Sequence, residues 1–143
     1  MFVELIESLR CPRAHDESPL VVTASRTEAR HILEGTLGCP VCHAEFPIHG
    51  GEALFGGDPA SQSEDPDAEI AVRIAAFLEL TDARGFAILC GRWAAHAAEV
   101  RRLSAMPLVL INPPRRAGVP ATAVIRVRDR VPLAPWSARA AAI

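Results

Sequence analysis

The sequence predicts an α+β protein in which a small β-rich domain precedes a partial α/β unit with a short, mostly parallel sheet. The first observation behind this is that two short Cys/His pairs lie among β-type segments near the N-terminus. The second is that helical patterns alternate with short apolar runs in the C-terminal half. We therefore expect a zinc-ribbon-like domain (1–57), an acidic linker (58–67) and a truncated Rossmann-like domain (68–143).

The N-terminal part contains one helical pattern and three strand patterns. Apolar residues recur at helical spacing over residues 2–9 and predict a short amphipathic helix or turn. Strands are expected at Pro19–Thr23, Arg30–Leu37 and Ala44–Ile48. A short apolar piece at residues 53–55 then lies between two Gly-Gly pairs, which indicate turns.

The C-terminal part alternates helices and strands. Asp65-Pro66-Asp67 predicts a helix start with Asp65 as the N-cap, and Gly85 predicts the end of that helix. Buried-type strands and one Ala-rich helix follow, at Phe86–Cys90, Trp93–Ala105 (the helix), Leu108–Ile111 and Ala123–Val127. A fourth strand of this unit is expected only to begin at Ile143.

The amino-acid composition limits the cellular compartments and the types of reaction that are expected for this protein. No apolar run approaches the ~18–20 residues of a membrane span, and Glu4 and Glu7 stand where a signal peptide would be basic. A Cys-x-x-Cys pair among four cysteines favours metal ligation or reduced thiols over disulfides. We therefore expect a cytoplasmic protein. The absence of lysine and tyrosine excludes a Walker A loop, a Schiff base and a tyrosine general acid.

The two halves carry opposite charge. Residues 1–72 contain 4 arginines and 13 acidic residues, whereas residues 73–143 contain 11 arginines and 4 acidic residues. The halves should attract each other, within one chain or between subunits. Two differently charged solvent-facing surfaces would produce the same counts.

The metal-site prediction rests on two turns. Cys39-Pro-Val-Cys42 offers one thiolate pair, and Cys11 with His15 offers the other in a Cys-x3-His arrangement. Two short ligand pairs brought together across turns are how tetrahedral zinc is usually bound. The alternative is a decayed site in which the cysteines are only small buried residues. His43 and His49 fall outside this spacing, and we expect them at the surface.

Residues 1–55 resemble the short zinc-ribbon family that includes the activator subunit of tRNA methyltransferases. The resemblance rests on Leu9-Arg-Cys11-Pro12, Pro19–Val21, Gly35–Cys42, Phe46-Pro47-Ile48 and Gly50–Leu54. Ala14 departs from the family, which usually has cysteine there. The resemblance implies a module that binds a protein, often a methyltransferase, and has no chemistry of its own.

The C-terminal half offers a reduced set of cofactor-binding residues. In nucleotide-binding α/β units the first strand leads into a glycine-rich loop and the second ends in an acidic residue. Here Gly91 remains, Trp93 and Ala95 stand where further glycines are expected, and Asn112 replaces the acid.

The order of elements over residues 68–143, with Asp129-Arg-Val-Pro132-Leu133, resembles the first half of a class I methyltransferase. The resemblance implies S-adenosylmethionine as cofactor, with Gly91, Asn112 and Asp129 as candidate contacts. A surface role for the Asp129 carboxylate is the alternative. Asn112-Pro113-Pro114 lacks the aromatic residue of amino-methyltransferase motifs and is interpreted as a rigid turn.

A nucleic-acid hypothesis rests on arginines. Arg126, Arg128 and Arg130 alternate along the predicted last strand and would form a row on one face, supported by Arg115-Arg116. Such a row could equally face the acidic half of the chain.

The leading hypothesis is a non-catalytic, methyltransferase-like scaffold that acts through self-association or a methyltransferase-type partner. We do not expect catalysis by the isolated chain. The alternatives are a methyltransferase that works only when assembled, and a ribbon-type nucleic-acid-binding protein.

Overall fold

The computed structural model describes residues 1–56, 65–114 and 122–143, and these residues form a mixed α/β fold. Most of the predicted linker therefore lies outside the described residues, as do Arg115 and Arg116. The elements, in chain order, are η1 (Val3–Ser8), β1 (Val21–Glu28), β2 (His31–Gly38), β3 (Glu45–His49), β4 (Glu52–Phe55), α1 (Ala68–Phe77), β5 (Ala87–Cys90), η2 (Gly91–His96), α2 (Ala97–Leu103), β6 (Leu108–Ile111), β7 (Ala123–Val127) and β8 (Ala140–Ala142).

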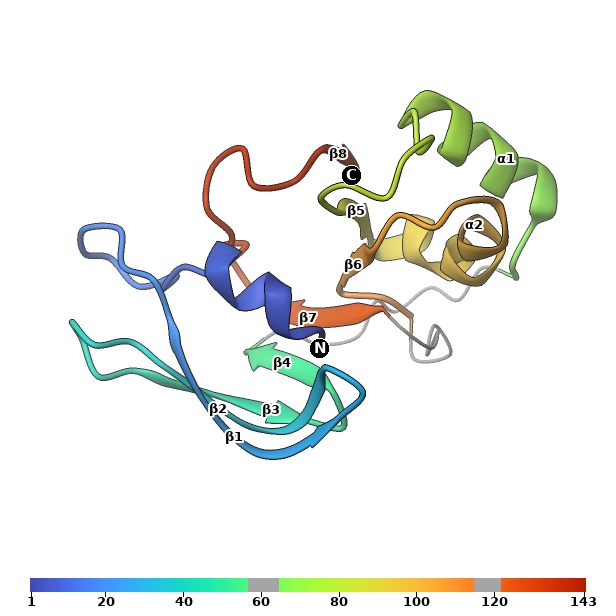
Figure 1. Cartoon of the computed structure of the whole chain (residues 1–143). Helices are drawn as coiled ribbons and strands as arrows, with labels where there is room; N and C mark the ends of the chain where they lie inside the picture. The colour runs from blue at the N-terminus through green and yellow to red at the C-terminus, as the bar shows by residue number, and fades with distance from the viewer. Residues whose placement is uncertain (57–64, 115–121) are drawn as a thin grey trace.

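One eight-stranded sheet runs through the molecule in the order β1-β2-β3-β4-β7-β6-β5-β8 (Figure 1). The pairs from β1 to β4 are antiparallel, and the pairs from β4 through β7, β6 and β5 to β8 are parallel. A two-residue turn joins β3 to β4, and Gly50 and Gly51 both have positive φ there, of 56° and 84°. Tight hairpins prefer this conformation because its twist matches that of the strands.

The parallel strands form a partial Rossmann-like sheet. Numbered along the C-terminal part alone, β5, β6, β7 and β8 are strands 1 to 4, and they lie in the order 3-2-1-4. This is the order in the first part of the dinucleotide-binding sheet. The expectation that a fourth strand only begins at Ile143 is wrong, because β8 already pairs with β5 from Ala140.

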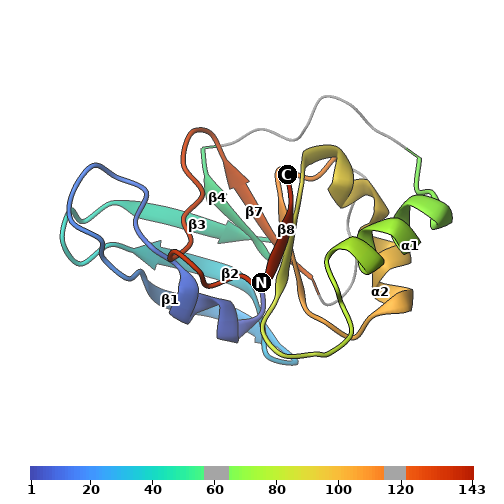
Figure 2. The ribbon, with the colours of Figure 1, turned by 90° about the horizontal axis from the view of Figure 1, so that it is seen from above.

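The parallel strands are covered on both faces. One face packs against α1 and α2 through a cluster that includes Leu89, Leu108 and Leu110. The other face packs against η1 and the ribbon strands, where Val109 and Ile125 belong to the same buried cluster as Leu5. Figure 2 shows the two helices on one side of the sheet and the N-terminal segment on the other. In this fold the ribbon occupies the second face, which helices cover in doubly wound sheets.

The junction between the ribbon and the Rossmann-like unit is a parallel strand pair, β4 with β7. Arg126 on β7 is only 6% exposed, and its guanidinium donates hydrogen bonds to both carboxylate oxygens of Glu52 on β4, at 2.9 and 3.2 Å. It also donates to the carbonyl of Pro113. This ion pair is an intrachain example of the attraction expected between the two halves.

The expected row of three arginines on one strand face is wrong. Arg126 points into the junction, whereas Arg128 and Arg130 lie beyond the end of β7 and are exposed. The periodicity argument assumed a solvent-facing side of the strand, and β7 has none because all five of its residues are buried.

The helix boundaries also differ from the predictions. Asp67, not Asp65, is the N-cap of α1, where its carboxylate accepts hydrogen bonds from the backbone of Glu69 and Ile70. The helix ends at Phe77 with Leu78 as C-cap, well before Gly85. The second helix begins as the 3-10 segment η2 before α2 continues it. None of the helices in the described ranges is long and apolar enough to cross a membrane.

The Glu52–Arg126 pair provides a test of the junction. Glu52→Gln should lower the free energy of unfolding by about 1–3 kcal/mol, because a buried guanidinium loses its charged partner. Urea denaturation followed by circular dichroism measures this. The matched control is Glu69→Gln, which removes an exposed pair with Arg73 on α1 and should cost no more than ~0.5 kcal/mol. Equal losses for the two variants would contradict a stabilising role for the junction pair.

Candidate metal centre

The predicted ligands lie in two turns, each of which is closed by backbone hydrogen bonds. The loop after η1 is closed by the amide of Cys11, which donates to Ser18 at 2.9 Å, and by that of Leu20, which donates to Leu9 at 3.2 Å. The turn between β2 and β3 is closed by the amide of Cys39, which donates to Ala44 at 2.9 Å. Both turns are therefore held by the ribbon's own backbone.

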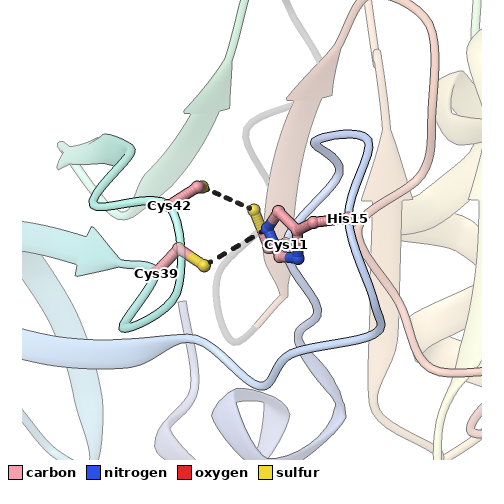
Figure 3. A group of neighbouring side chains, drawn as sticks. All are labelled: Cys11, His15, Cys39 and Cys42. Atoms are coloured by element: carbon pink, nitrogen blue, oxygen red, sulfur yellow. Dashed lines mark hydrogen bonds between the residues drawn. The ribbon is translucent and has the colours of Figure 1, made fainter.

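The turns bring all four predicted ligands together. One donor atom from each of Cys11, His15, Cys39 and Cys42 lies within 4.8 Å of every other. Figure 3 shows Cys39 and Cys42 on one turn facing Cys11 and His15 on the other. The Sγ atoms of Cys11 and Cys42 are 3.7 Å apart, and Cys39 Sγ lies 3.5 Å from His15 Nε2.

The Cys11–Cys42 and Cys39–His15 distances match two edges of a tetrahedral zinc site. With Zn–S near 2.3 Å and Zn–N near 2.05 Å, a tetrahedron has S···S edges of about 3.8 Å and S···N edges of about 3.6 Å. A disulfide would need sulfur atoms about 2.05 Å apart, and all four cysteines are free thiols. The donor set of three thiols and one imidazole could hold zinc, and His15 supplies the corner that Ala14 leaves empty.

The ring of His15 is oriented by a backbone contact. Its Nδ1 lies 2.6 Å from the carbonyl oxygen of Asp16. Because a carbonyl can only accept, Nδ1 carries the proton and Nε2 keeps its lone pair, which faces Cys39. Metal-binding histidines in proteins usually have such a partner on the second nitrogen.

Burial and hydrogen bonding shift the pKa values of Cys39 and Cys11 in opposite directions. Burial raises the pKa of Cys39, but the backbone amides of Cys42 and Val41 and the neighbouring thiols lower it more strongly, to about 6. Burial raises the pKa of Cys11 to about 11, against a smaller opposing effect of the Arg13 backbone. A bound cation would favour the deprotonated form of all three thiols.

The remaining cysteine and two histidines lie elsewhere. Cys90 is half-buried at the end of β5, and burial raises its pKa. His43 is exposed and adopts a positive φ of 57° beside the metal turn without joining the cluster. His49 is exposed and lies 3.0 Å from the carboxylate of Glu34.

The three candidate cofactor contacts lie at the carboxyl ends of neighbouring parallel strands. Gly91 follows β5 with a φ of 53°, and Asn112 follows β6. The Asn112 side chain donates to the carbonyl of Val127 and accepts from its amide, both at 2.8 Å. Asp129 is exposed two residues beyond β7. Asn112 thus links the carboxyl end of β6 to that of β7, and its own φ is positive, at 47°.

The fold and the donor set define the N-terminal part as a zinc-ribbon-type module joined to a Rossmann-like sheet. The family model described as Trm112p-like protein matches residues 3–51, which span η1, both metal turns and the strands up to the start of β4. No curated protein and no solved structure matches the chain. The family likeness is therefore confined to the ribbon.

The geometry predicts that the purified protein contains about one zinc ion per chain. Cys39→Ser and His15→Ala should each lower the zinc content several-fold, measured by plasma mass spectrometry. Replacement by Co²⁺ should produce the visible absorption of a tetrahedral thiolate site. Removal of the metal with a chelator should lower the melting temperature, because metal binding to such sites contributes directly to folding.

Matched controls lie outside the cluster. Cys90→Ser and His43→Ala remove the same donor types and should leave the zinc content unchanged. A metal-free wild-type protein, or equal losses in the control variants, would contradict the assignment.

Proposed function

We propose that this protein is a non-catalytic, methyltransferase-like scaffold in which the zinc ribbon stabilises its own Rossmann-like half. The assembled unit acts through protein contacts at the open edge of the sheet. The observation that carries the proposal is the parallel pairing of β4 with β7. In the resembled family the ribbon binds a separate protein, often a methyltransferase. In this chain a ribbon strand pairs with a methyltransferase-like sheet of the same chain.

The contacts around this pairing support a permanent intrachain interface. The segment after β7 returns to the ribbon, where the amide of Arg10 donates to Pro132 at 2.9 Å and the amide of Ala134 donates to Ser8 at 2.8 Å. Leu133 packs against the core cluster that the ribbon and the parallel strands share. The ribbon thus has the role of a built-in subunit.

The candidate cofactor residues do not fit S-adenosylmethionine. A cofactor-binding loop needs small residues after the first strand so that the ligand approaches the backbone. Here the helix η2 follows β5 directly, and its Trp93 is partly buried, with the guanidinium of Arg92 4.6 Å from its ring centre. Asn112 holds the backbone of β7 instead of presenting its amide to a ribose. We assign no catalytic step to these residues.

The edge strand β8 is the best candidate for a protein contact. Beside it lies an apolar groove of about 380 Å³, lined by Ile70, Ile74, Phe77, Leu78, Trp93 and Ala142 with Arg73 at its rim. Phe77 at the end of α1 is 89% exposed. An open strand edge beside exposed apolar side chains favours pairing with another chain.

The opposite edge of the sheet is protected. β1 is mostly exposed, carries Arg26 and Glu28, and has irregular register on both sides of Arg26. Charges and bulges on an edge strand oppose pairing with other chains. We therefore place the contact at β8 and take a second copy, related by a two-fold axis, as the first partner to test.

Self-association through β8 makes the protein a dimer at micromolar concentration. Phe77→Arg should shift it to a monomer, because a charge on the groove cannot be buried against an apolar surface. Size-exclusion chromatography with light scattering measures the mass. A monomeric wild type at micromolar concentration would contradict self-association and leave a different protein as the partner.

Leu103→Arg is the matched control. Leu103 is the last residue of α2, as Phe77 is of α1, and it is 53% exposed but does not line the groove. The control variant should remain dimeric. Loss of the dimer in both variants would show a general charge effect.

A further inference from the structure

A second cavity lies where the metal turn meets the ends of two parallel strands. Its volume is about 390 Å³, and its walls are Pro12-Arg13-Ala14 from the first metal turn, Phe46, the end of β4 at Phe55-Gly56, and Arg128-Asp129-Arg130 after β7. β4 and β7 are parallel neighbours, so both end at this cavity. In α/β sheets, ligands bind outside the carboxyl ends of the strands.

The walls carry an excess of positive charge. Arg13, Arg128 and Arg130 are exposed, and none of them forms an ion pair with a carboxylate in the described part of the chain. Asp129 offsets one of these charges. A zinc ion with three thiolates would add one further negative charge nearby. The cavity remains electropositive, which suits an anion with several oxygen acceptors.

The remaining wall is aromatic. The rings of Phe46 and Phe55 are 4.6 Å apart and tilted by 34°. Phe46 is buried, while Phe55 is only half-buried and lines the cavity. An aromatic face beside a group of arginines is the combination that binds a base and its phosphate. The volume lies at the small end of the range for ligand sites, so it suits one nucleotide.

From these observations we propose that this cavity binds a nucleotide unit, with Arg13, Arg128 and Arg130 on its phosphate and Phe55 against its base. The chemistry is shared by a free mononucleotide and by one residue of a single-stranded nucleic acid. The site is separate from the β8 edge, so it does not depend on the proposed protein contact.

Two probes test the proposal with the full-length, zinc-loaded protein. Adenosine monophosphate is titrated by calorimetry, and a fluorescein-labelled single-stranded RNA of about 12 nucleotides is titrated by fluorescence anisotropy. The triple variant Arg13→Gln, Arg128→Gln, Arg130→Gln should weaken binding at least about tenfold. Phe55→Leu should weaken both probes several-fold and leave the competition by inorganic phosphate unchanged.

A control variant with the same change in net charge distinguishes binding at this cavity from general electrostatic attraction. Arg30→Gln, Arg84→Gln, Arg102→Gln removes three exposed arginines that line neither this cavity nor the groove beside β8, and it should change affinity by less than about threefold. Circular dichroism and zinc content confirm that the variants are folded. If adenosine monophosphate binds more tightly than RNA per nucleotide, the ligand is a free nucleotide. If RNA binds more tightly per nucleotide, the ligand is a single-stranded nucleic acid.

Three results would overturn the proposal. The first is the absence of saturable binding by both probes. The second is an equal loss of affinity in the control variant. The third is an unchanged affinity of Phe55→Leu for both probes, because the cavity would then bind only an anion.

Discussion

The structure depends on the parallel pairing of β4 with β7. This four-residue contact joins an antiparallel ribbon to a parallel sheet and makes one continuous eight-stranded sheet of them. Glu52 and Arg126 hold the pair together in a place where a lone guanidinium would be costly to bury. Because β7 is covered on both faces, its stability requires the ribbon on one side and the helices on the other.

The two metal turns come before this junction along the chain. The turn at Cys39 closes the hairpin of β2 and β3, and the Gly50-Gly51 turn then leads from β3 into β4. A metal that fixes the first turn therefore constrains the strand that meets β7. This connection is the physical basis of the proposed role, in which the ribbon stabilises the Rossmann-like sheet of its own chain.

Local features of the fold could be predicted from the sequence, and long-range ones could not. The ligand set was predictable because each pair lies within one short turn, and the bounds of β6 and β7 were predictable because both are continuous apolar runs. The strand β4 was not expected, since one of its two partners, β7, lies about 70 residues away. β8 consists of three alanines, whose β-propensity is poor, and it forms a strand because β5 offers an unpaired edge.

The predictions for Asp65 and Arg126 were wrong for the same reason, because both depend on contacts between residues far apart in the sequence. Asp65 and Asp67 are equally good caps by sequence, and hydrogen bonding of the Asp67 amide to the buried His96 ring places the helix start at the later residue. Arg126 has the pattern of a surface arginine, and only the fold brings Glu52 to it. Zinc binding itself and the partner at β8 remain predictions.

The central claim is that the ribbon and the Rossmann-like half form one cooperative unit through β4 and β7. Hydrogen–deuterium exchange with mass spectrometry, before and after removal of the metal by a chelator, tests it most directly. The account predicts that chelation increases exchange in β7 and β6 as well as in the ribbon, because loss of the metal turns releases β4. Increased exchange confined to residues 1–51, with β7 still protected, would contradict it.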